Sequence, residues 1–159
     1  MKILKPKFWD QNYFTFSSLI LLPVTLLYSI IIFFKKKLYT QQKFPISVIC
    51  VGNLYVGGTG KTPVSIEISK FLKELNQNPV IIKKKYLDQD DEIFLLKKYS
   101  KVLISKKRSE AINNAIEKKY NFAVLDDGYQ DQGIKKDLSI VCFNGSQKIG
   151  NGLIIPSGP

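Results

Sequence analysis

The glycine-rich stretch from Val51 to Pro63, which reads VGNLYVGGTGKTP, constrains the fold of this chain more than any other. It follows a short apolar run at 46–50 and precedes a segment with helical spacing. A strand, a glycine-rich turn and a helix that opens with Lys-Thr are typical of a phosphate-binding P-loop, because successive backbone N–H groups and the helix N-terminus attract anions. The stretch predicts a nucleotide-phosphate site formed by Gly57, Gly58, Thr59, Gly60, Lys61 and Thr62.

Two residues of this stretch have expected roles of their own. The Lys61 ammonium should reach the β- and γ-phosphates, and the Thr62 hydroxyl should bind Mg²⁺. The match is not strict, because the pattern G-x-x-x-x-G-K-[ST] would place its first glycine at Tyr55. The alternative is an ordinary glycine turn before a helix. Such a turn needs neither Lys-Thr at the helix start nor an apolar strand directly before it.

Short apolar runs alternate with helically spaced segments along the rest of the chain. Strands are expected at 46–50, 79–82, 101–104, 121–125 and 138–143, and helices at 62–76, at 108–120 and after the acidic residues near 90. In the helix at 62–76, the residues spaced for packing on a sheet are Ile68, Phe71, Leu72 and Leu75. In the helix at 108–120 they are Ala111, Ile112, Ala115 and Ile116. This alternation predicts an α/β fold, a P-loop NTPase-like, mainly parallel sheet with flanking helices and the nucleotide at the strand C-terminal ends.

Two clusters of carboxylates follow expected strands. Asp126 and Asp127 end an apolar strand, where a P-loop protein carries the aspartate that organises its Mg²⁺. Gly128 beside them leaves a turn signal as the alternative. The second cluster, Asp88, Asp90, Asp91 and Glu92, stands at an expected helix start, where carboxylates also complement the helix dipole without any catalytic role.

The segment 14–34 carries no charge over 21 residues, and lysines flank both of its ends. Three alternatives are open: a helix in the membrane interface, a helix that spans the membrane, and a buried core helix. Because both flanks are positive, the distribution of lysines indicates no orientation.

The composition excludes some classes of function. A formal charge of +11 favours an anionic partner such as a nucleotide, a nucleic acid or an anionic lipid surface. Arg108 is the only arginine and no nucleic-acid motif is present, so no nucleic-acid partner is predicted. The chain contains no histidine, which excludes histidine-based catalysis within it. Cys50 and Cys142 lie in apolar runs, where small buried thiols are expected.

Three motifs together resemble the tetraacyldisaccharide 4'-kinase family of lipid A biosynthesis. They are VGNLYVGGTGKTP at 51–63, VLDDGYQDQGIKKDLSIVCF at 124–143 and GNGLIIPSGP at 150–159. The resemblance covers nearly all of this chain and about the first half of a family member. It implies an apolar, membrane-associated segment at 1–44 and a P-loop kinase domain at 45–159 that is truncated at its C-terminal end.

The resemblance also implies an activity and a place. The activity is ATP- and Mg²⁺-dependent phosphorylation of the 4'-hydroxyl of a tetraacylated glucosamine disaccharide 1-phosphate. The place is the cytoplasmic face of the bacterial inner membrane, and no oligomeric state is implied. By motif match, Lys61 and Thr62 bind phosphate and metal, Asp126 and Asp127 belong to the metal site, and Asp91 is the candidate general base.

The chain departs from the family pattern in four places. The Arg-Gly-Tyr of the family is Lys84-Lys85-Tyr86, and the loop from there to Asp91 is short. Asp131 stands where a histidine often follows, and the family's downstream half, with a histidine that pairs with the base, is absent. These departures leave open whether this chain catalyses the phosphorylation by itself. The alternatives are a membrane-associated P-loop ATPase switch that binds a protein, and a non-catalytic nucleotide-binding remnant.

Overall fold

The computed structural model of the chain describes residues 6, 9, 15–38, 40–53, 60–85, 90–143, 145 and 151–158, without the side chains of 36–38 and 90. In chain order the helices and strands are α1 (Phe16–Ile20), α2 (Leu22–Leu38), β1 (Ser47–Asn53), α3 (Lys61–Glu74), β2 (Pro79–Lys84), α4 (Asp90–Tyr99), β3 (Val102–Ser105), α5 (Arg108–Glu117), β4 (Phe122–Asp126) and β5 (Leu138–Cys142). They belong to two compact units. The first holds 1–39, 54–59 and 143–159, and the second holds 40–53 and 60–142. The domain boundary expected after residue 44 stays a prediction.

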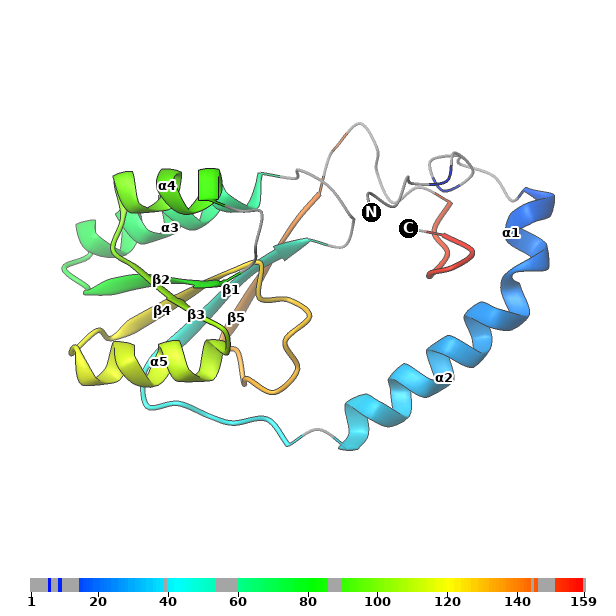
Figure 1. The fold of residues 1–159 in the computed structure, drawn as a ribbon, viewed down its shortest axis with the longest axis horizontal. Helices are drawn as coiled ribbons and strands as arrows, with labels where there is room; N and C mark the ends of the chain where they lie inside the picture. The colour runs from blue at the N-terminus through cyan, green and yellow to red at the C-terminus, as the bar shows by residue number, and fades with distance from the viewer. Residues whose placement is uncertain are drawn as a thin grey trace. The chain divides into compact units, whose positions relative to one another are not determined.

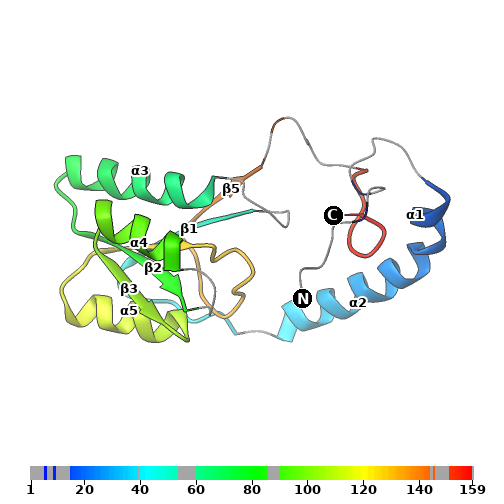
Figure 2. The same cartoon turned by 45° about the horizontal axis from the view of Figure 1, so that its top comes forward.

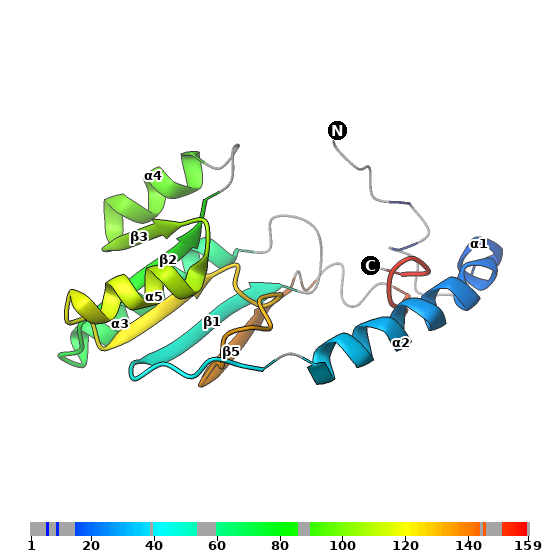
Figure 3. The same cartoon turned by 60° about the horizontal axis from the view of Figure 1, so that its bottom comes forward.

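The second unit is a five-stranded parallel sheet with the strand order β3-β2-β4-β1-β5. Figure 1 shows α3 and α4 on one face of this sheet and α5 on the other, and Figure 2 shows α3 and α4 next to each other. Figure 3 shows β1 and β5 side by side at one edge. The α/β prediction is confirmed, because each helix between two strands crosses over the sheet to another parallel strand. α4 joins the neighbours β2 and β3, whereas α3 and α5 each join strands that have one strand between them.

Alternate residues of the central strands form two apolar cores, since successive side chains of a strand point to opposite faces. The core under α5 includes Val48, Ile82, Leu125, Ala111 and Ile112. The core under α3 and α4 includes Ile49, Ile81, Val124, Ile66, Leu72 and Leu96. The inward face predicted for α5 is confirmed, with Ile116 partly buried beside the first core.

The inward face predicted for α3 is wrong in part. Phe71 and Leu75 are more than half exposed, whereas the buried residues of the helix are Thr62, Ser65, Ile66, Ser69 and Leu72. Positions 62, 65, 66 and 69 also have the i, i+3, i+4, i+7 spacing, but three of them are hydroxyl residues. A search for apolar residues alone therefore misses this face. The small side chains of Thr62, Ser65 and Ser69 let α3 lie close to the sheet.

The first unit holds α1, α2 and a C-terminal segment at 151–158, coloured red in Figure 1. Thr15 and Ser18 cap α1 reciprocally, each side chain accepting the other's backbone N–H. The Thr25 and Ser157 hydroxyls are buried against each other at 2.7 Å, and the Trp9 indole donates to the Pro156 carbonyl. The C-terminal segment thus packs on α2 through polar contacts.

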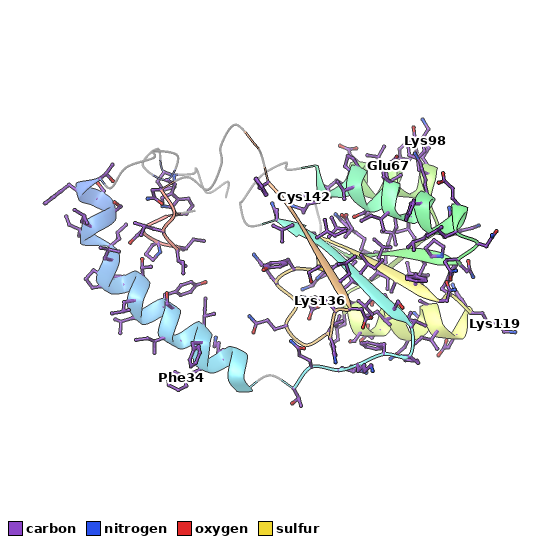
Figure 4. All side chains as sticks on the ribbon, turned by 180° about the vertical axis from the view of Figure 1, so that it is seen from behind. Phe34, Glu67, Lys98, Lys119, Lys136 and Cys142 are labelled. Carbon is purple, nitrogen blue, oxygen red and sulfur yellow. The ribbon has the colours of Figure 1, made fainter. Side chains whose placement is uncertain are left out.

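The apolar side chains of α1 and α2 are largely exposed, and Phe34 stands out from the helix in Figure 4. Phe16 is 80% exposed, and Leu26 and Phe33 are exposed by nearly two thirds. Within the described part of this chain, α1 and α2 are therefore not buried core helices. Among the described residues, no helix is both long enough and apolar enough to cross a membrane.

Candidate active site

Of the predicted phosphate-binding residues, the structure describes Gly60, Lys61 and Thr62. Gly60 directly precedes α3 and has a φ of +78°. A residue with a Cβ adopts this left-handed backbone at a cost, so glycine suits the position. Lys61 and Thr62 follow in the first turn of α3, where the unpaired backbone N–H groups carry partial positive charge. Gly57, Gly58 and Thr59 lie outside the described residues, and their roles stay predictions.

Asp126 is the last residue of β4, and its carboxylate is fully buried beside the start of α3. The Thr62 hydroxyl donates to its Oδ2 at 3.4 Å, and the buried Ser65 hydroxyl donates to its Oδ1 at 3.1 Å. The fold thus brings Thr62 and Asp126, 64 residues apart in sequence, within contact. Both were predicted as metal ligands, and both supply the oxygen atoms that Mg²⁺ prefers.

Asp127 follows the strand with φ +59°, and its carboxylate lies 3.5 Å from the Lys61 ammonium. The buried Arg108 guanidinium donates from Nη2 to the carbonyl of Asp127 at 2.6 Å and to that of Asp126 at 3.3 Å. Its Nη1 lies 3.8 Å from a carboxylate oxygen of Asp131. Arg108 therefore holds the backbone turn that directs the Asp127 carboxylate toward Lys61.

Lys83 is a charged group at this site that the sequence did not single out. Its side chain is 2% exposed, and its Nζ donates to Asp126 Oδ2 at 2.6 Å and to Glu92 Oε2 at 2.5 Å. Burial lowers the pKa of Lys83, but the two carboxylates outweigh burial and raise the pKa above its ordinary value. The Lys83 side chain is therefore a cation at neutral pH.

The acidic residues at the start of α4 have different positions. Glu92 reaches the site through Lys83, whereas Asp91, the candidate base, is exposed. The side chain of Asp90, and all of Asp88, lie outside the described part of the chain. The role of Asp91 stays a prediction. The residue at the start of α4 that contacts the site is Glu92, which accepts a hydrogen bond from Lys83.

The oxygen donors at the site fit Mg²⁺ by their chemistry. Thr62 and Asp126 are already in contact, and Asp127 lies beside Lys61. Among the described residues, no group of three or more His, Cys, Asp or Glu side chains is placed to hold a metal ion by itself. A metal bound by so few protein oxygens takes further ligands from water or phosphate, as Mg²⁺ in nucleotide sites does.

Sequence reasoning missed Ser65, Lys83 and Arg108. Ser65 lies one turn after Thr62 on the same face of α3, a spacing that could have pointed to it. Arg108 is the only arginine of the chain, but no sequence pattern assigns it to the site. Lys83 sits in a run of three lysines that looks like a solvated strand end.

Comparison with known proteins assigns the chain to a family. The sequence model described as Tetraacyldisaccharide-1-P 4'-kinase (LpxK) matches residues 17–159. This chain belongs to the tetraacyldisaccharide-1-P 4'-kinase family. The resemblance carried by the three motifs is thereby confirmed.

Individual relatives agree with the assignment. The tetraacyldisaccharide 4'-kinase of Pelagibacter ubique is 47% identical over 162 residues, which cover 100% of this chain and 50% of the relative. That of Rickettsia canadensis is 36% identical over 175 residues, covering 100% of this chain and 53% of the relative. A crystal structure of LpxK from Aquifex aeolicus in complex with ATP is 28% identical with a TM-score of 0.68, and the match covers 89% of this chain and 53% of that one. The chain therefore spans about half the length of the LpxK relatives that it matches.

Proposed function

We propose that this chain carries the nucleotide-binding half of a lipid kinase that transfers the γ-phosphoryl group of ATP to the 4'-hydroxyl of a tetraacylated glucosamine disaccharide 1-phosphate. The observation that carries the proposal is the pairing of Lys61 with Asp127 and of Thr62 with Asp126 at the start of α3. The names of the relatives and the ATP complex of the Aquifex aeolicus LpxK support the substrates.

In the proposed reaction the 4'-oxygen of the sugar forms a bond to the γ-phosphorus of ATP. The bond from that phosphorus to the β,γ-bridging oxygen breaks, and ADP leaves with the electron pair. The proton of the hydroxyl passes to a base, for which we propose Asp91. Phosphoryl transfer requires mainly positioning and charge stabilisation, which the Lys61 ammonium and the N-terminal amides of α3 supply.

We further propose a magnesium ion at Thr62, Asp126 and Asp127. When bound, the ion neutralises charge on the β- and γ-phosphates. Thr62 and Asp126 would hold it directly or through water, and Ser65 would keep the Asp126 carboxylate oriented. Asp127 would stay close enough to Lys61 to align the ammonium.

The proposed place of action is the cytoplasmic face of the bacterial inner membrane. The exposed apolar side chains of α1 and α2 support this, because a contiguous apolar helix surface is energetically costly in water. Lysines 35–37 stand near the end of α2. Each basic residue near an anionic leaflet contributes roughly 1 kcal/mol to the free energy of membrane binding. We propose that this helix lies in the membrane interface and so keeps the active site near acyl chains that remain in the bilayer.

The kinase proposal is tested on the lipid kinase of which this chain is the proposed nucleotide-binding half. The assay contains γ-labelled ATP, Mg²⁺ and the tetraacylated disaccharide 1-phosphate, and the lipid products are separated by thin-layer chromatography. A bis-phosphorylated lipid is expected. Lys61→Ala should abolish it, whereas Lys73→Ala, an exposed lysine in the last turn of the same helix, should not. ATP hydrolysis stimulated by a protein, without lipid product, would favour the ATPase switch. Nucleotide binding without either reaction would favour the remnant.

The proposed base is tested by Asp91→Asn. We expect the variant to lose turnover while its affinity for ATP changes little, because an exposed Asp91 does not help to hold the nucleotide site together. Wild-type turnover in Asp91→Asn would move the base elsewhere, with Asp90 the first candidate.

The membrane location is tested by flotation with anionic phospholipid vesicles. Deletion of residues 14–34 should abolish co-flotation, and Lys61→Ala should leave it intact. Co-flotation of the deletion variant would mean that another surface binds the membrane.

A further inference from the structure

Lys83 and Asp126 are placed together by the register of the sheet. β2 and β4 are parallel neighbours, and the two residues are direct partners in the ladder. Paired residues of parallel neighbours point to the same face, so both side chains enter the side of the sheet that α3 and α4 cover. Both side chains are almost completely buried there. A one-residue change of register would separate them, so the pair is a fixed property of this fold.

One oxygen of Asp126 has two partners. Oδ2 accepts from the Lys83 ammonium at 2.6 Å and from the Thr62 hydroxyl at 3.4 Å. The other oxygen accepts from Ser65. The ammonium therefore lies on the same carboxylate oxygen that faces the predicted metal ligand Thr62. In a buried environment, two cations close to one carboxylate oxygen repel each other strongly.

Glu92 gives the Lys83 ammonium a second partner. Its carboxylate comes from α4, is about half exposed, and lies 2.5 Å from Nζ. Lys83 can therefore give up Asp126 and remain paired with a carboxylate. Asp126 has less freedom, because its carboxylate is fully buried and an ionised buried carboxylate is costly without a cation beside it.

We propose that Lys83 is a tethered cation that competes with a divalent metal ion for Asp126 Oδ2. When the metal is absent, Lys83 neutralises Asp126 and keeps the site assembled. When the metal binds at Thr62 and Asp126, the ammonium remains with Glu92. This arrangement keeps the affinity for metal alone low, so that the phosphates of a nucleotide are needed to hold it. The inference rests on the proposed function only in taking the metal to bind at these two residues.

The test measures binding of Mn²⁺ alone to the whole chain by electron paramagnetic resonance, without nucleotide or lipid. Lys83→Met keeps most of the side-chain volume without the charge, and Lys83→Ser leaves a small hydroxyl. Both variants should bind Mn²⁺ about tenfold more tightly than the wild type, because a buried positive charge near the ion has been removed. Lys101→Met, which removes an exposed lysine just before β3, is the matched control and should leave the affinity unchanged.

A second measurement follows thermal unfolding with and without Mn²⁺. The ion should raise the melting temperature of the Lys83 variants more than that of the wild type, because it takes over the neutralisation of Asp126. A purely structural lysine would give variants that are less stable and bind Mn²⁺ equally or more weakly, which would overturn the proposal. Variants that fold only with Mn²⁺ support it, and variants that stay unfolded at saturating Mn²⁺ overturn it. The assay involves no phosphoryl transfer, so a failure of the kinase proposal would be seen separately.

Discussion

Substitution of Arg108 tests whether its hydrogen bonds stabilise the turn at Asp126 and Asp127. Asp127 has a left-handed backbone, φ +59°, which costs a non-glycine residue about 1 kcal/mol. The Arg108 guanidinium donates to both carbonyls of the turn, and its side chain is 5% exposed. The arginine should therefore stabilise a strained turn that carries the carboxylate beside Lys61. Arg108→Met removes these bonds and keeps an apolar side chain of similar length.

The size of the effect follows from the three contacts. The short bond to the Asp127 carbonyl is charge-assisted and is expected to contribute about 1.5–3 kcal/mol. The bond to the Asp126 carbonyl is long at 3.3 Å, and we count about 0.5–1.5 kcal/mol for it. The pair with Asp131 at 3.8 Å is partly exposed and adds about 0–1 kcal/mol. Arg108 Nε is buried without a partner among the described residues, and methionine removes that cost. We expect a net loss of about 2–4 kcal/mol.

The measurement is urea unfolding followed by far-UV circular dichroism, together with binding of a fluorescent ATP analogue. The affinity should fall about tenfold, since a relaxed turn moves Asp127 away from Lys61. The control is Lys107→Met, because Lys107 is the neighbouring cation, is largely exposed, and only approaches Glu110 at 3.9 Å. Its stability should stay within about 0.5 kcal/mol of the wild type. An Arg108→Met variant within about 1 kcal/mol of the wild type, with unchanged affinity, would refute the reasoning.

Two further predictions concern close packing near the site. Gly52→Ala should destabilise the chain by about 1–3 kcal/mol, because a Cβ at Gly52 would overlap the Tyr129 side chain. Gly145→Ala, where a Cβ meets open space, is the control, and equal unfolding midpoints for the two variants would contradict the prediction. Cys50 should react with a thiol reagent much more slowly than Cys142, since burial is complete at Cys50 and raises the pKa of its thiol. Two kinetic phases are expected, assigned with Cys142→Ser, and a single fast phase for both thiols would be evidence against this packing.

The sequence by itself determined the fold class and the place of the site. Strand, glycine turn and Lys-Thr form a local pattern, because the anion site is built from consecutive backbone groups. The aspartates at the end of an expected strand could be assigned to the same site, since the carboxyl ends of parallel strands meet at one edge. The structure confirmed this meeting in the contacts of Thr62 with Asp126 and of Lys61 with Asp127.

Only the tertiary structure decided which other residues serve the site. Lys83 lies in a run of lysines, and a run gives no sign of which ammonium is buried. The register of β2 against β4 turned Lys83 toward Asp126, and the packing of α4 brought Glu92 onto the same ammonium. The inward face of α3 was misjudged for a related reason. Burial of Ser65 and Ser69 depends on how closely α3 approaches the sheet, a distance set by partners far away in sequence. Local patterns reveal contacts between chain neighbours, whereas a buried ion pair between strands depends on the register of the whole sheet.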